Sequence, residues 1–328
     1  MRRALLLWWA VAAIAATPAQ ASTTDPAALV RLAGSVLRVE APTVRGTLAV
    51  GSAVTVAPER VVTNCHVTRE ARVVYVIRGG VRWEAQEQSS DVERDLCLLH
   101  VPGLVSPAVP MSSAGQLVVG QEVAALGFTG GAMMQRSLGD VLALHRHDGA
   151  AVIQSSTWFS SGASGGGLFD GQGALVGVLT FRLRGGAAHW FAAPVEWVHQ
   201  MLDEPQRMQA APVKPLDTAL TAYWQRPSGL QPRFLRAAVM QRDQAWTDLM
   251  QLSREWLDNE GDDAEPWDLL GTAFEQLGRL DDARDALQCA LQLAPSRAAL
   301  QSKLLALDSR LPARHRAIDA DACRTQRR

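Results

Sequence analysis

The pattern of apolar and polar positions changes along the chain. From about Val36 to Pro194, short apolar runs recur between turn residues, for example Ala53–Val56, Leu96–Val101 and Leu175–Phe181. Many short strands at near-regular spacing, without helical periods between them, predict an all-β barrel or sandwich. Residues 196–202 are expected to form the helix that closes this domain.

The last third of the chain has helical periodicity. Apolar residues recur there at spacings of three and four, as at Phe234, Ala237 and Ala238. Between the two patterns, Asp203–Asp217 is rich in proline and polar residues, which is typical of a linker. We therefore expect a β domain at 22–202, a linker at 203–217, an all-α domain at 218–311 and a polar tail at 312–328.

The first 21 residues have the pattern of a secretory signal peptide. Arg2 and Arg3 precede the apolar run Ala4–Ala16, and Ala19-Gln20-Ala21 is a small-x-small cleavage site. The run has 13 residues, short of the roughly 20 that span a bilayer. A membrane anchor is the alternative. We expect a periplasmic or secreted protein with no stable membrane span after signal removal.

The net charge and composition of the chain limit the classes of molecule that it is expected to bind. Without Arg2 and Arg3, 30 basic residues stand against 33 acidic ones, a net charge of −3. This balance does not indicate nucleic acid as a partner. A hydrophobic content of 48% is sufficient for packed cores, and the remaining length predicts two domains.

A glycine-rich stretch, Ser161–Gly167, is the strongest chemical signal. Glycines adopt backbone angles closed to other residues, so two N–H groups can point into one space beside the Ser164 hydroxyl. Such a space stabilises an oxyanion, and the serine beside it can act as a nucleophile. The plain alternative is a flexible surface turn.

Two residues upstream favour the chemical interpretation. His66 is a base suited to accept a hydroxyl proton near neutral pH. Asp95 begins an apolar strand, where an unpaired charge is costly, so it needs a partner. A buried carboxylate that orients an imidazole is what nucleophilic serine chemistry requires.

The chain resembles the trypsin-like serine proteases, and most closely their bacterial high-temperature-requirement (HtrA or Deg-type) branch. The resemblance covers roughly residues 30–202. It rests on Gly51–Val54, Val62–Val67, Asp95–Leu99, Ala125–Phe128, Ser137–Val141, Ile153–Asp170 and Trp190–Pro194. It implies a double β-barrel, serine endopeptidase activity on protein or peptide substrates, and no cofactor.

The resemblance also assigns roles to single residues. Ser164 is the expected nucleophile, His66 the general base and Asp95 its orienting partner. The N–H groups of Gly162 and Ser164 are expected to form the oxyanion hole. Thr180 stands where the family often has a hydroxyl near the buried aspartate, although a plain strand threonine is equally compatible with the sequence.

The substrate pocket is less defined. By the resemblance, Phe159 and Ser160 form one wall, Phe181 lies on the other, and His189 lies near the base. No Asp stands where selection of basic residues needs one. We expect a small or medium apolar side chain to be preferred. Selection of an acidic residue by His189 is the alternative.

Two positions depart from the family pattern. Ala163 replaces the usual Asn or Asp before the serine, and Gly167 replaces a usual proline and is expected to loosen the turn. An inactive relative that serves as a peptide-binding scaffold or adaptor therefore stays open. Because His66, Asp95 and Ser164 are all present, an active endopeptidase is the preferred interpretation.

The remaining Cys and His residues were weighed for other chemistry. If the strands of His66 and Asp95 meet, Cys65 and Cys97 either form a disulfide or remain two buried free thiols. His145 and His147 have no acidic or Cys neighbour at ligand spacing. We expect both to be surface residues and predict no metal.

The helical domain resembles tetratricopeptide repeats. Trp267, Leu270, Gly271, Phe274, Ala283 and Pro295 follow the repeat signature, with a degenerate repeat before it and a capping helix at residues 296–311. A generic helical hairpin is the alternative. Stacked helix pairs form grooves that bind peptides or protein partners. Helices that only brace the barrel are the other possibility.

Overall fold

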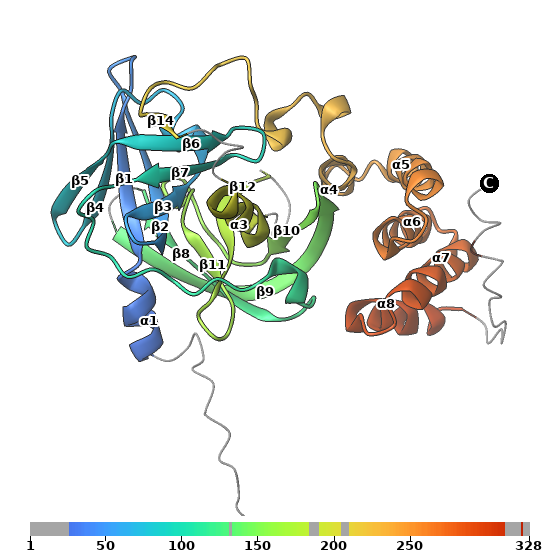
Figure 1. Cartoon of the computed structure of the whole chain (residues 1–328). Helices are drawn as coiled ribbons and strands as arrows, with labels where there is room; N and C mark the ends of the chain where they lie inside the picture. Colours follow the sequence, from blue (N-terminus) through green and yellow to red (C-terminus); the bar gives the residue numbers. More distant parts are fainter. Residues whose placement is uncertain (1–25, 131–132, 184–189, 205–209, 312–322, 324–328) are drawn as a thin grey trace, which may run out of the picture.

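The computed structural model describes residues 26–130, 133–183, 190–204, 210–311 and 323. A β domain comes first, and a helical region lies to one side of it (Figure 1). The expected signal peptide, His189 and the tail apart from Cys323 lie outside the described residues. No helix within the described residues is long and apolar enough to span a bilayer.

The first half of the β domain is an eight-stranded antiparallel sheet that forms a half-barrel. Its strand order is β14-β6-β7-β3-β2-β1-β4-β5. The strands are β1 (Val36–Pro42), β2 (Leu48–Ala57), β3 (Arg60–Thr63), β4 (Val74–Arg78), β5 (Val81–Ala85), β6 (Glu87–Asp91), β7 (Leu96–His100) and β14 (Ala211–Pro212).

The second half is a closed six-stranded barrel of order β10-β13-β12-β11-β8-β9. Its strands are β8 (Glu122–Thr129), β9 (Met133–His147), β10 (Ala150–Ser155), β11 (Gly167–Phe169), β12 (Leu175–Arg182) and β13 (Trp190–Pro194). The expected double-barrel architecture is therefore present as a closed barrel beside a half-barrel.

Strand periodicity explains how the two halves join. Successive side chains of a strand point to opposite faces. Ala53 of β2 packs inside the first half, whereas its neighbour Val54 belongs to a second core shared with barrel residues such as Val178. Alternate residues therefore fill two cores, and the three residues expected to form a triad come from both halves.

Short helices lie at the edges of this domain. Helix α3 (Val195–Asp203) follows β13 directly and buries Trp197, whose indole donates to the Asp148 carbonyl at 3.1 Å. The other short elements are α1 (Pro26–Ala33), α2 (Cys65–Thr68), η1 (Ala114–Gln116), η2 (Tyr223–Gln225) and η3 (Ser228–Leu230).

The described end of the expected linker, residues 210–217, lies along the surface of the half-barrel. Ala211 and Pro212 pair with β6, and Leu216 N–H donates to the Arg69 carbonyl at 2.8 Å. Proline and polar residues are compatible with an edge strand, so composition alone did not distinguish the two cases. Residues 211–216 are held along the first half of the β domain.

Five helices follow, each packed against the next: α4 (Arg233–Arg242), α5 (Trp246–Asn259), α6 (Ala264–Gln276), α7 (Leu280–Leu293) and α8 (Ala298–Asp308). A Cβ at Gly271 would lie 2.8 Å from Leu287 Cγ, so the crossing of α6 and α7 requires glycine. Trp267, Leu270, Phe274 and Ala283 are buried beside it. A disulfide joins Cys289 of α7 to Cys323.

The helical region packs against the barrel. Phe234 and Leu235 of α4 and Trp256 of α5 belong to the same buried cluster as barrel residues. His145 lies beneath them with 5% of its surface exposed. Our expectation of a surface histidine was therefore wrong for His145, because α4 and α6 cover β9. His147 is half-buried, 4.7 Å from the Tyr223 ring.

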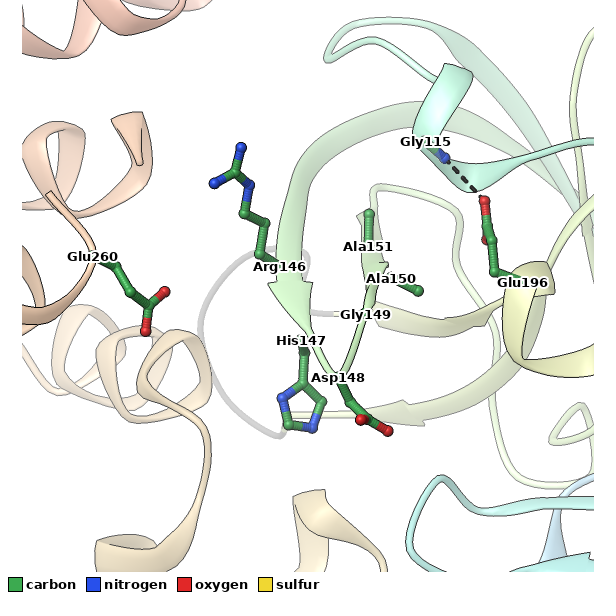
Figure 2. Close-up of a pocket in the computed structure, with 9 residues that line it drawn as sticks. All are labelled: Gly115, Arg146, His147, Asp148, Gly149, Ala150, Ala151, Glu196 and Glu260. Atoms are coloured by element: carbon green, nitrogen blue, oxygen red, sulfur yellow. Dashed lines mark hydrogen bonds between the residues drawn. The ribbon is translucent and has the colours of Figure 1, made fainter. Parts of the chain in front are cut away.

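A pocket of roughly 660 Å³ lies beside this contact. Figure 2 shows the β9–β10 hairpin, Arg146 to Ala151, between Glu260 of the helical region and Glu196 of α3. The lining contains charges of both signs and none of the three triad residues. We assign it to the junction of the two regions rather than to peptide cleavage.

Candidate active site

The site is built around the contact between His66 and Asp95. His66 Nδ1 lies 2.7 Å from Asp95 Oδ2, and the backbone N–H of His66 donates to Asp95 Oδ1 at 2.8 Å. The Asp95 side chain is 2% exposed and that of His66 is 26% exposed. The carboxylate is thus buried behind a ring whose far side reaches solvent.

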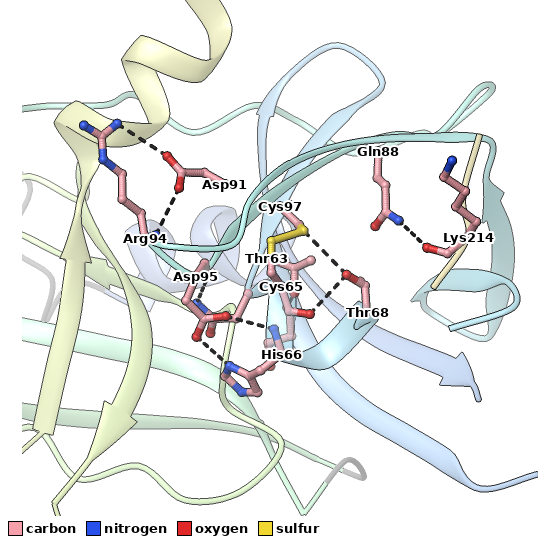
Figure 3. The surroundings of a disulfide bond; sticks show 12 residues. Thr63, Cys65, His66, Thr68, Gln88, Asp91, Arg94, Asp95, Cys97 and Lys214 are labelled. Atoms are coloured by element: carbon pink, nitrogen blue, oxygen red, sulfur yellow. Dashed lines mark hydrogen bonds and ion pairs between the residues drawn. A yellow bond between two sulfur atoms is a disulfide. The ribbon is translucent and has the colours of Figure 1, made fainter. Parts of the chain in front are cut away.

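Local structure brings these two residues together. His66 lies in α2, one turn after β3, and Asp95 directly precedes β7, the neighbour of β3 in the sheet. Asp95 has φ +61°, a conformation that Asp tolerates better than most residues. A Cys65–Cys97 disulfide joins the two segments (Figure 3). Of the two states left open for these cysteines, the structure contains the disulfide.

The electrostatics suit a general base. Burial by itself lowers the pKa of His66, but the charge of Asp95 and its hydrogen bond raise it, and the net pKa lies above 6.5. Asp95 holds the Nδ1 side of the ring, which leaves Nε2 to exchange a proton with a substrate or a hydroxyl.

Ser164 lies in the turn before β11, and its carbonyl accepts from the Ser52 N–H at 2.8 Å. Its hydroxyl donates to the Thr180 carbonyl at 3.4 Å. Among the described residues no hydrogen bond joins Ser164 to His66. Catalytic hydrogen bonds are often long or misaligned without substrate, so this arrangement is compatible with a resting nucleophile.

The backbone N–H groups of Gly162 and Ser164, which are expected to form the oxyanion hole, are left without partners by the described bonds around them. Ser161 C=O accepts from Gly130 N–H at 2.7 Å, and Ala163 C=O accepts from Gly166 N–H at 2.8 Å. In a trans peptide the N–H points opposite to the C=O. The N–H groups of Gly162 and Ser164 therefore point away from these partners, and neither has an acceptor among the described residues. Gly162 adopts φ +95°, which favours glycine.

Ser52 holds this turn in place, a role that sequence reasoning missed. Its buried hydroxyl donates to the Gly162 carbonyl at 2.8 Å and accepts from Phe128 N–H at 2.8 Å. Ser52 thereby connects the first half of the β domain to the nucleophile turn. It lies in the Gly51–Val54 motif, but nothing in that motif identified the hydroxyl as the contact.

Thr180 is near Asp95 without contacting its carboxylate in the described hydrogen bonds. Its hydroxyl donates to the Val178 carbonyl at 2.8 Å and accepts from Asn64 Nδ2 at 3.3 Å. Asn64 Nδ2 also donates to the backbone carbonyl of Asp95 at 2.9 Å. Thr180 therefore reaches the aspartate through Asn64, which the sequence had not singled out.

The described phenylalanines expected around the substrate pocket lie in two different buried clusters, Phe159 in one and Phe181 in the other. Phe159 is 5% exposed, and its carbonyl accepts from the Trp190 indole at 3.0 Å. Ser160, which follows it, is half-buried. Phe181 is stacked between Phe191 and Trp224, at centroid distances of 4.7 and 4.8 Å. His189 lies outside the described residues.

The departures from the family pattern fit the local packing. Ala163 is 1% exposed beside Gly127, where a Cβ would lie 3.0 Å from Ala163 atoms. Gly167 pairs with Leu126 and Val178 as the first residue of β11. A Cβ there would lie 2.4 Å from the Phe169 ring. Gly167 therefore stands in a paired strand position that has no room for a side chain.

Metal chemistry finds no support in the described part of the chain. It contains no group of three or more His, Cys, Asp and Glu side chains that could hold a metal ion.

The fold and the candidate site are similar to those of trypsin-like peptidases. Residues 51–178 match the family model of the trypsin-like peptidase domain. Mouse serine protease HTRA4 is 26% identical over 166 residues, which are 48% of this chain and 34% of the mouse protein. Serine endoprotease DegS of Haemophilus influenzae is 31% identical over 130 residues, 38% of each chain.

Another relative is the probable periplasmic serine endoprotease DegP-like of Chlamydia trachomatis, 27% identical over 153 residues, 44% of this chain and 31% of the relative. The chain thus spans about a third of the length of the curated relatives it matches.

Solved structures agree on the fold. The HtrA-type protease AlgW with tripeptide has 28% identity and a TM-score of 0.50, and the match covers 54% of this chain and 62% of that one. The Rv3671c protease of M. tuberculosis in its active form has 23% identity and a TM-score of 0.51, covering 66% and 98%. The chain therefore carries a trypsin-like domain with HtrA- and Deg-type relatives.

Proposed function

We propose that this protein is an exported serine endopeptidase that hydrolyses peptide bonds through an acyl-enzyme. The observation that carries the proposal is the buried Asp95 carboxylate at 2.7 Å from His66 Nδ1, on a domain with serine endoprotease relatives. The apolar leader at residues 1–21 and the name of the periplasmic DegP-like relative support export.

The residues divide the work as follows. His66 Nε2 accepts the proton of the Ser164 hydroxyl as Ser164 Oγ attacks the scissile carbonyl. Asp95 stabilises the imidazolium that forms. The N–H groups of Gly162 and Ser164 stabilise the negative oxygen. His66 then gives its proton to the leaving amine, and the acyl-enzyme remains on Ser164. In the second half of the reaction, a water molecule gives a proton to His66 and attacks the acyl carbonyl, and His66 returns the proton to Ser164 Oγ as the acid product leaves.

The helical region has two roles in this proposal. A groove along the helix pairs would dock a substrate or a protein partner, whereas the shared core around Phe234 and Trp256 supports a bracing role. We propose that α4, α5 and the start of α6, where Glu265 pairs with His145, brace the barrel. The surface of α7 and α8 is then available for docking.

A peptide-binding scaffold without activity is the second candidate. The observation that favours it is the Ser164 hydroxyl, which donates to the Thr180 carbonyl rather than to His66. A scaffold of this kind would bind peptides in the same cleft without forming an acyl-enzyme.

Labelling with a fluorophosphonate probe tests the proposal. The wild-type chain should be labelled at Ser164, and Ser164→Ala should be folded but unlabelled. Peptide hydrolysis should fall on the order of 10⁶-fold in this variant if the triad works as a unit. Absence of labelling in the folded wild-type chain favours the scaffold instead.

A further inference from the structure

A tryptophan from outside the barrel contacts the proposed triad. The indole N–H of Trp224 donates to Asp95 Oδ2 at 3.2 Å. The same ring lies edge-on to His66, with 5.8 Å between centroids, and stacks on Phe181 at 4.8 Å. Trp224 is therefore in contact with two triad residues and with one residue of the expected substrate pocket.

We propose that Trp224 is a positioning residue of the triad: it holds the Asp95 carboxylate in the orientation in which Asp95 holds His66. The inference rests on the proposed peptidase function. In this proposal, the candidate active site includes a residue of η2, which follows the β domain in the chain, in addition to residues of the β domain itself.

The Trp224 indole is the third hydrogen-bond donor to the buried Asp95 carboxylate. Asp95 Oδ1 accepts from the His66 N–H, and Oδ2 accepts from His66 Nδ1 and from the Trp224 indole. A carboxylate that is 98% covered needs its lone pairs satisfied, because an unpaired buried acceptor costs free energy. The Thr180 hydroxyl, which the family resemblance placed near this carboxylate, bonds to Val178 and Asn64 instead. The indole supplies the remaining donor.

The backbone around Trp224 is fixed on both sides. Tyr223 N–H donates to the Glu93 carbonyl at 2.9 Å, two residues before Asp95. Arg226 pairs with the Glu93 side chain at 2.6 Å, and Gln231 Nε2 donates to the Trp224 carbonyl at 2.9 Å. The turn η2 is thus hydrogen-bonded to the loop that carries Asp95. The Trp224 indole is therefore held beside the carboxylate by the surrounding backbone.

Removal of this donor has a defined electrostatic consequence. With one donor fewer, the negative charge of Asp95 is less neutralised and attracts the imidazolium of His66 more strongly. The protonated form of His66 is then favoured, and the general base becomes available only at higher pH. A residue that merely fills space would not change this titration.

Trp224→Phe is the variant that tests the proposal, because it keeps an aromatic ring on Phe181 and removes only the N–H donor. Trp256→Phe is the matched control: its indole also donates to a carboxylate, Glu260 Oε2, at 3.1 Å, but in the helical region. We expect Trp224→Phe to lower kcat about tenfold, with little change in KM. The acid limb of its kcat/KM profile should move to higher pH. Trp256→Phe should change neither.

Nuclear magnetic resonance gives a readout that does not depend on activity. The Trp224 indole proton of the full-length wild-type chain should shift as His66 titrates, whereas the Trp256 indole proton should not. The pKa of His66 measured from its ring protons should rise in Trp224→Phe alone. An indole signal insensitive to His66, or an unchanged His66 pKa in Trp224→Phe, overturns the proposal.

The two proposals fail in different ways. If the wild-type chain cleaves no peptide and takes no probe, the peptidase function is wrong, and the titration alone decides the role of Trp224. If the wild type is active and Trp224→Phe matches Trp256→Phe in rate and pH profile, only the positioning role is wrong.

Discussion

His145 Nδ1 lies 2.6 Å from Glu265 Oε1, which joins strand β9 of the barrel to helix α6. His145 Nε2 faces Gln154 Oε1 at 2.9 Å, and the ring stacks on Phe234 at 4.5 Å. Since both ring nitrogens face side-chain oxygens, a protonated ring can donate to both of them. Burial lowers the pKa of His145, but the charge and hydrogen bond of Glu265 raise it above 6.5, opposed by the charge of Arg297.

This pair predicts a pH-dependent stability. Because the folded pKa exceeds the unfolded value, the pair contributes fully below pH 6.5 and is lost as the pH rises through the folded pKa. Glu265→Gln should lower the free energy of unfolding by about 1.5–3 kcal/mol at pH 6, and by less at pH 9. Tm measured across pH 5.5–9 checks this. Equal losses at both ends of the range would contradict the assignment, and exposed Glu255→Gln is the control.

The proposed base His66 predicts a pH–rate profile. Hydrolysis needs neutral His66, whose pKa is raised by Asp95. The value of kcat/KM should therefore fall as the pH drops, with a midpoint above 6.5. Stopped assays with a small peptide over pH 5–9 measure it. A midpoint well below 6.5 would mean that a different group limits the rate.

The sequence predicted the parts of the site that depend on local motifs. His66 stands in a short helix after β3, whereas Asp95 and Ser164 stand in turns that lead into β7 and β11. The local motifs and the order of the three residues along the chain are the signal. Trp224 and His145 depend on how a distant segment docks. Strand alternation does not show that α4 and α6 will cover His145. Tyr223 and Trp224, an aromatic pair in a polar stretch, were the only local hint of docking there.

Ser52→Ala should damage the oxyanion site without touching the triad. It removes the hydroxyl that connects Gly162 O to Phe128 N, which frees the turn to rotate its N–H groups. We expect a loss of about 1–3 kcal/mol in the free energy of unfolding. We also expect kcat to fall on the order of tenfold, with KM nearly unchanged.

Ser106→Ala is the matched control for this effect. Its hydroxyl also makes two hydrogen bonds, to Thr55 and to the Gly34 carbonyl, but away from the nucleophile turn. Steady-state kinetics and denaturant unfolding of both variants separate stability from rate. If Ser52→Ala loses stability but keeps the kcat of Ser106→Ala, Ser52 has no role in forming the anion site.

Truncation after Leu202 tests whether the helical region braces the barrel. The cut removes Tyr223, Phe234 and Trp256, which are 1%, 2% and 3% exposed within a core shared with the barrel. The barrel face beneath them would become exposed, so Tm should fall and even small peptides should be cleaved more slowly. A truncated chain that keeps its Tm and its small-peptide rate, but no longer cleaves folded proteins, would identify the helices as a docking module instead.

Since the cut also removes Trp224, the full-length variant Phe234→Ala tests the packing of the helices on the barrel separately. It should cost about 3–5 kcal/mol and, at temperatures where it remains folded, leave the acid limb of the pH–rate profile unchanged.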